Sequence, residues 1–164
     1  MSVSLWEALD DALIDTFVAQ MGEASAHADL QITGAEVGAA FDDEHTPMPA
    51  VLITSVRSEI APESHGAGDP HVGIRYQYVA SAFMVDTSYR AAKIAAQTLH
   101  ARMIATLRGW RAIIRDAQTA TTTDETAHQL RIRGSFIEIH ARQDNDEADH
   151  IGAAYVRFDI DTTS

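Results

Sequence analysis

The segment from Tyr89 to Ile114 constrains the fold most, because its apolar residues recur at the spacing of one helical face. These residues follow one another at intervals of three or four and form a single seam: Ala92, Ala96, Leu99, Met103, Leu107 and Trp110. The small alanines near the start of the seam would let the helix lie close to a flat sheet. Gly109 is a candidate for the end of this helix, and Trp110 to Arg115 would then begin a new segment. We therefore predict a long amphipathic helix packed on a sheet.

A second stripe of the same helix is basic, and its members are Arg90, Lys93, Gln97, Arg108, Arg111 and Arg115. The simplest interpretation is a solvated helical face. A contact between subunits is the next interpretation, because the acidic N-terminal part of the chain offers a complementary surface. A DNA-binding helix ranks third, because these arginines lack supporting aromatic or loop residues. The candidates for a subunit interface are Arg90, Lys93, Arg108, Arg111 and Arg115.

The net charge of −12 is unevenly distributed along the chain. Residues 1–70 contain 13 acidic side chains and one basic side chain, Arg57, whereas residues 71–164 contain 11 of each. A chain with this excess of acidic residues is a poor candidate for binding nucleic-acid phosphates, which requires a basic surface. An acidic surface is most simply solvated, although it can also repel DNA or meet a basic partner.

Length and composition indicate one globular domain, which we assign to residues 1–164. The hydrophobic fraction of 46% and the charged fraction of 22% are ordinary for this class. The absence of cysteine excludes disulfides and thiolate metal sites. The N-terminal segment carries acidic residues and no basic stretch, so we expect no signal peptide. No apolar run reaches the length of about 18 residues that a membrane span needs, so we expect no membrane partner.

Three further elements precede the long helix. Ser4 to Val18 reads as an amphipathic helix with Ser4 and Glu7 at capping-box spacing. Its carboxylates are expected to point outward, namely Glu7, Asp10, Asp11 and Asp15. Ala50 to Arg57 and Val72 to Thr87 read as strands, and the second is so long that a bulge, a bend or an extension beyond the domain is expected. The segments 42–49 and 62–71 read as loops.

The C-terminal part predicts an antiparallel hairpin after a polar loop over residues 117–127. In Leu130 to Arg142 the apolar residues occupy even positions at first and odd positions later. The change falls near Gly134 to Phe136, and a β-bulge there would explain it. Ile151 to Thr162 alternates regularly, with its inward side formed by Ala154, Val156, Phe158 and Ile160. The fold class is therefore α+β: a mixed or antiparallel sheet of about four to five strands, with an N-terminal helix and one long helix packed on it.

No catalytic signature is present: the chain lacks GxSxG, GxxxxGKS/T, GxGxxG and HExxH. Three segments contain possible metal ligands, namely 42–44, 65–71 and 144–149, but none has a recognisable ligand spacing. His140 and His150 could face each other across the hairpin, although surface positions are the simpler interpretation. We therefore expect no catalytic residue, no cofactor site, no metal site and no enzymatic activity.

With these elements in place, the chain resembles the tail terminator (tail-completion) proteins of long-tailed bacteriophages and related tail-like particles. An arrangement of elements carries the resemblance. It comprises the opening helix WEALDDALIDTF, the strand PAVLITSVRSE, the long strand IRYQYVASAFMVDT, the helix SYRAAKIAAQTLHARMIATLRGWR and two closing strands. Residues 23–48 and 116–128 do not contribute to it.

The resemblance implies a structural virion protein that forms a homo-oligomeric ring, expected to be a hexamer. Such a ring caps the tail tube, stops its polymerisation and joins the tube to the neck or head-completion protein. It would be assembled in the host cytoplasm and located at the tail–neck junction, with DNA passing through its lumen. Another ring protein of the neck or tail, such as a head–tail connector or a tube-like protein, is the alternative. A small-ligand-binding α+β domain is the rival from a different class.

Overall fold

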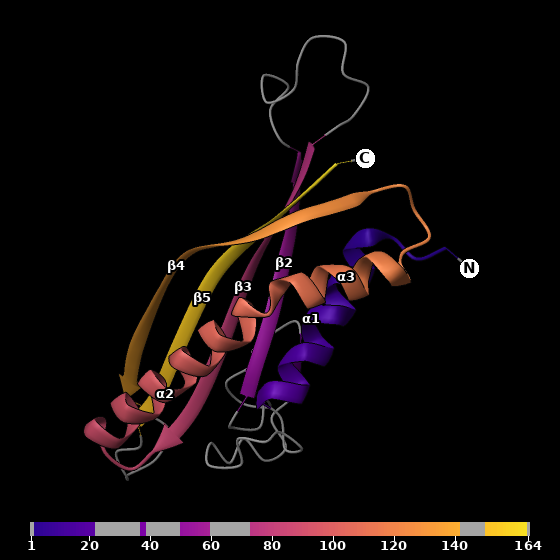
Figure 1. The fold of residues 1–164 in the computed structure, drawn as a ribbon. Coiled ribbons are helices and arrows are strands. Elements are labelled where there is room, and N and C mark those ends of the chain that lie inside the picture. The colour runs from indigo at the N-terminus through magenta and orange to yellow at the C-terminus, as the bar shows by residue number, and fades with distance from the viewer. Residues whose placement is uncertain (1, 22–36, 39–49, 60–72, 142–149, 164) are drawn as a thin grey trace.

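The computed structural model describes residues 2–21, 37–38, 50–59, 73–141 and 150–163, which form one sheet and three helices (Figure 1). The helices are α1 (Leu5–Met21), α2 (Tyr89–Arg108) and α3 (Trp110–Ala120). The strands are β1 (Val37–Gly38), β2 (Ala50–Glu59), β3 (Gly73–Asp86), β4 (Thr126–Ala141) and β5 (His150–Thr163). All three helices lie on the same side of the sheet (Figure 1). The predicted α+β class is therefore confirmed.

The sheet order is β1-β2-β3-β5-β4, and four of its strands are antiparallel. The short β1, which the sequence analysis did not identify, pairs in parallel with Val51 and Leu52 of β2. β3 pairs with β5 from Gly73↔Thr163 to Asp86↔His150 without a shift of register, so the long strand contains no bulge. All 14 residues of β3 pair with the 14 residues of β5, and Ile74 to Phe83 also pair with the 10 residues of β2. The predicted C-terminal hairpin is confirmed.

The irregularities of the sheet lie on β4. Its register against β5 shifts between Ala127 and Gln129, and again between Ile132 and Gly134. The second shift is the bulge that the change of apolar parity indicated, placed at Arg133, just before the predicted stretch. Beyond it Ile137 packs against the helix-covered core, whereas Phe136 is on the opposite face.

The two predicted helices form because each begins at a serine cap and buries one apolar stripe. The Ser4 hydroxyl accepts the backbone N–H of Glu7 at 3.1 Å, and the Ser88 hydroxyl accepts that of Ala91 at 3.1 Å. α1 buries a stripe formed by Leu5, Ala8, Leu9, Leu13, Phe17 and Met21. α2 buries the predicted seam through Ala92, Ala96, Leu99, Met103 and Leu107.

The prediction of a loop from residue 117 was wrong, because a third helix continues to Ala120. The helix breaks at Gly109, as the sequence suggested, but Gly109 has φ −81°, so the break does not use the left-handed conformation. α3 then buries Ile113, Ile114 and Ala117 on its own apolar side. Gln118 closes the short turn into β4, because its side chain donates to the Glu125 carbonyl at 2.8 Å and accepts from the Ala127 N–H at 3.0 Å.

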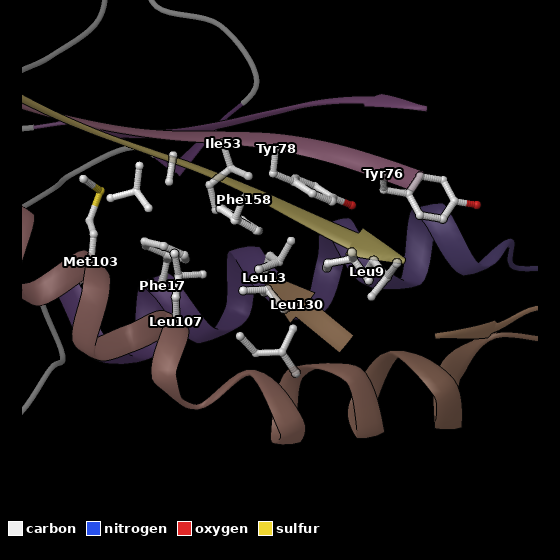
Figure 2. Packing of buried hydrophobic residues seen from close by; sticks show 14 of the residues in the cluster. Leu9, Leu13, Phe17, Ile53, Tyr76, Tyr78, Met103, Leu107, Leu130 and Phe158 are labelled. Atoms are coloured by element: carbon white, nitrogen blue, oxygen red, sulfur yellow. The ribbon is translucent and has the colours of Figure 1, made fainter. Parts of the chain in front are cut away.

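The core lies between the helices and one face of the sheet (Figure 2). Tyr78 of β3 stacks on Phe158 of β5, with ring centroids 5.1 Å apart. Leu13 and Phe17 of α1 point toward these rings from the helical layer (Figure 2). This face is apolar along the central strands. The burial of this one surface therefore stabilises the packing of α1, α2 and α3 alike.

A polar link joins α1 to the sheet at the edge of this core. The Tyr78 hydroxyl donates to Asp10 Oδ1 at 2.8 Å, and the Ser55 hydroxyl donates to the same oxygen at 3.4 Å. Trp6 Nε1 donates in turn to the Ser55 oxygen at 3.0 Å. The expectation that Asp10 points to solvent was therefore wrong. The carboxylate faces inward because a buried tyrosine hydroxyl needs an acceptor.

Burial alters the pKa of both partners. Desolvation raises the pKa of Asp10 above 3.8, although the hydrogen bonds from Tyr78 and Ser55 oppose the shift. Desolvation, together with the Asp10 charge, raises the pKa of Tyr78 above its ordinary value of 10.0. Tyr78 therefore stays protonated and remains a donor.

We expect Asp10→Ala to lower the free energy of unfolding by about 1–3 kcal/mol, because it leaves the buried Tyr78 hydroxyl without its acceptor. Asp10→Asn retains an acceptor oxygen and serves as the matched control, with a much smaller loss. Because the folded protein holds the Asp10 proton more tightly, stability from this group falls as pH rises through the window above 3.8. Urea unfolding between pH 3 and 8 should show the wild type losing stability relative to Asp10→Asn as pH increases. A relative gain would contradict this assignment.

A second prediction concerns the close approach of α2 to β5. A Cβ at Gly152 would lie 2.2 Å from the Ala92 carbonyl oxygen and 3.3 Å from the Ala96 Cβ. Gly152→Ala should therefore separate the helix from the strand and destabilise the fold by about 1–3 kcal/mol. Gly134→Ala is the control, because no atom lies within 4 Å of the added methyl group. Equal melting temperatures of the two variants would contradict this packing.

Candidate subunit interface

The five candidate residues for a subunit interface are all exposed, but they do not form one stripe. Arg90 and Lys93 lie at the beginning of α2, and Arg108 is its last residue. Arg111 and Arg115 belong to α3. The helical break at Gly109 therefore separates the basic residues into two groups at different places on the helical layer.

The helical layer is strongly polarised in charge. Residues 2–21, which include α1, contain four acidic side chains and no basic one. Residues 89–120, which form α2 and α3, contain six basic side chains and one acidic side chain, Asp116. The one ion pair described within α3 joins Arg115 to Asp116 at 3.4 Å, and both side chains are more than half exposed. Such a pair contributes little to stability and leaves Arg115 available for other contacts.

A shallow hollow of about 500 Å³ lies between α3 and the start of β4. Its lining combines apolar and basic groups: Trp110, Arg111, Ile114, Arg115, Gln118, Thr119 and His128. The Arg111 guanidinium lies 5.2 Å from the centroid of the Trp110 ring, a cation–π distance that holds the arginine over the hollow. His128 bonds to the Thr163 hydroxyl at 2.8 Å and is thereby tied to the end of β5. None of the described residues that line this hollow is acidic.

The face of the sheet opposite the helices carries a cross-strand network of charges. Arg133 Nε lies 2.6 Å from Asp159 Oδ2, and Arg75 Nε lies 2.9 Å from Asp161 Oδ1 and 3.7 Å from Asp159 Oδ2. The hydrogen bond to Asp161 is the main reason that the pKa of Arg75 is raised. The network joins β3, β5 and β4, and a depression of about 420 Å³ lies beside it, lined in part by Arg157. The ion pairs therefore satisfy Asp159, which is largely buried.

An aromatic cluster lies further along the same face. Phe136 of β4 stacks on Tyr155 of β5 at 4.7 Å, and Tyr155 meets Phe83 of β3 edge-on at 5.8 Å. Phe83 is buried, together with Leu52 and Ala153, whereas Phe136 remains 47% exposed. The cluster therefore has a solvent-facing side that could be covered by another molecule.

The sequence analysis missed the charge network and the aromatic cluster. Outward alternation of Tyr155, Asp159 and Asp161 was visible, but their partners are on other strands. The register that places Arg133 beside Asp159 depends on the bulge, so a one-residue error would have paired the wrong side chains. Strand spacing alone could not have identified these contacts.

The metal-site candidates find no support in the described part of the chain. No group of three or more His, Asp or Glu side chains there could hold a metal ion. His140 is opposite Ile151 and His150 is opposite Ala141, so the two histidines project from opposite faces of the hairpin. The other candidates, at 42–44, 65–71 and 144–149, lie outside the described residues.

The helices that the structure describes include none long and apolar enough to cross a membrane. The fold is that of an α+β protein whose described helices all lie on one side of the sheet. Comparison with known proteins finds no protein-family model that matches the chain and no curated protein that matches it.

Proposed function

We propose that this protein is a structural assembly protein that closes into a homo-oligomeric ring and acts as a tail terminator. In this proposal the ring caps the tail tube of a long-tailed bacteriophage, stops its polymerisation and joins the tube to the neck or head. It is located at the tail–neck junction of the virion and lets DNA pass through its lumen. It has no catalytic role.

The observation that carries the proposal is the second face of the sheet, on which none of the described helices lies (Figure 1). Large apolar side chains remain open to solvent there: Val56 of β2 is 61% exposed and Phe136 of β4 is 47% exposed. Phe136 belongs to the aromatic cluster with Tyr155 and Phe83, and aromatic side chains that stay partly exposed on such a surface are typical of contacts between proteins. A ring subunit needs such a surface.

The edge strand β4 supports the same proposal. In the described part of the chain its 16 residues pair with β5 alone, so its other edge presents unpaired backbone groups. The two register shifts and the arginines at 131 and 133 make this edge irregular and charged, which opposes indiscriminate pairing. Contact between copies is thereby restricted to a partner with a complementary surface.

The alternatives from the sequence analysis remain distinct in what they predict. Another ring protein of the neck or tail would also assemble, but would not limit tube length. A small-ligand-binding domain is favoured by the hollow beside Trp110, whose volume of about 500 Å³ lies within the range usual for ligand sites. That reading predicts a monomer whose hollow binds a small molecule.

The first test is the mass of the purified protein, measured by light scattering behind size exclusion over a hundredfold range of concentration. We expect an assembly of about six subunits of 17.8 kDa each, with an open centre in negative stain. Addition to polymerising tail tube protein should produce capped tubes of limited length. A monomer at every concentration that also leaves tube length unchanged would overturn the proposal.

A further inference from the structure

The exposed side of α1 carries a regular row of carboxylates. Glu7, Asp11 and Asp15 recur every four residues, and all three are exposed. Four residues of an α-helix span about 6 Å along the axis, so these side chains form one line. Val18, which is 45% exposed, continues the line at its C-terminal end. We call this line the acidic stripe.

The hollow on α3 has the matching features. Arg111 and Arg115 are also four residues apart, and both line the hollow beside Trp110. Their spacing along the helix is therefore the same, about 6 Å. We call these two arginines with Trp110 and Ile114 the basic hollow. It combines two cations with an apolar floor, whereas the acidic stripe combines anions with an apolar end.

The two surfaces do not satisfy each other within one subunit. α1 and α3 pack together through apolar residues, and no ion pair joins Asp11 or Asp15 to Arg111 or Arg115 among the described contacts. The described contact of Arg111 is the Trp110 ring, and that of Arg115 is its neighbour Asp116. Complementary charge is thus left open on both surfaces.

We infer that the acidic stripe of one copy lies in the basic hollow of the next copy. An antiparallel arrangement of the two helices places Asp11 opposite Arg115 and Asp15 opposite Arg111, and brings Val18 against Trp110. The contact joins unlike surfaces, so each copy offers one of each, and repetition gives a ring when the rotation between successive copies closes, as the proposed ring requires. The inference rests on the proposed ring and specifies its subunit contact.

Two double variants test this contact. Variant one carries Asp11→Arg and Asp15→Arg, and variant two carries Arg111→Asp and Arg115→Asp. Each alone turns two attractions into two repulsions, so the concentration needed for half-assembly should rise about tenfold or more. In an equimolar mixture the reversed, basic stripe of variant one meets the reversed, acidic hollow of variant two, and the native stripe of variant two meets the native hollow of variant one. The mixture should therefore recover assemblies in which the two variants alternate.

The comparison variant, used as the control for net charge, is Arg90→Asp with Lys93→Asp; it changes the charge by the same amount as variant two and tests the other group of interface candidates. These residues lie at the beginning of α2, away from the hollow, and acidic groups are favourable at a helix N-terminus. This control should fold and assemble like the wild type. Circular dichroism and melting temperature check folding of every variant. Where a reversal lowers the melting temperature, Asp11→Asn with Asp15→Asn replaces it and should weaken assembly in the same direction.

The outcomes separate the contact from the function. Wild-type rings with loss in each variant and recovery in the mixture support the contact. Wild-type rings that persist in both variants, or that are lost without recovery on mixing, overturn the contact and leave the proposed ring intact. Loss of assembly in the Arg90 and Lys93 variant alone would indicate a contact through α2, and would overturn the proposed contact as well. A wild type that stays monomeric, alone and with tube protein, overturns both proposals.

Discussion

The pairing of β3 with β5 is the constraint on which the rest of the structure depends. It runs without interruption from Gly73 to Asp86 and determines which side chains lie on each face of the sheet. On one face it aligns Tyr78 with Phe158, and three helices cover that surface. On the other face it aligns Arg75 with Asp161. A slip of one residue would exchange the two faces, so the core and the charge network share one register.

The one-sided helical layer has consequences for the surface. Helices that bury their apolar stripes against a sheet expose their polar sides, and here the exposed sides differ in charge. α1 exposes carboxylates, whereas α2 and α3 expose arginines and a lysine. The break at Gly109 also gives the last two arginines a different setting from the first three, because they lie beside Trp110. The acidic and basic segments of the chain therefore form separate surfaces of the folded molecule.

Together these features leave several surfaces of the molecule that are available for contacts with other molecules. One sheet face lacks a described helix, the outer side of β4 pairs with no described strand, and complementary charges lie on different helices. Such an arrangement suits association in which each copy presents different surfaces to its two neighbours. The proposed ring at the end of a tail tube uses these properties, and no step of it requires a catalytic group.

Periodicity in the sequence was sufficient to predict both long helices, the central strands and the C-terminal hairpin. Each of these elements buries one continuous apolar stripe, so a single period identifies it. The parity change in β4 even located its bulge to within a few residues. The sequence also indicated that the basic candidates are exposed, but it placed on one stripe five residues that the break at Gly109 divides between two helices.

Only the tertiary structure determined which side chains are in contact with one another. Asp10 turned inward because Tyr78 supplies a buried donor from a strand 68 positions away. The hollow at Trp110 exists because Gly109 ends α2 and the start of β4 returns beside α3. The network around Asp159 joins three strands whose register a bulge adjusts. Local pattern therefore determined the elements and their buried sides, whereas contacts between distant segments determined which polar groups became partners and which stayed open.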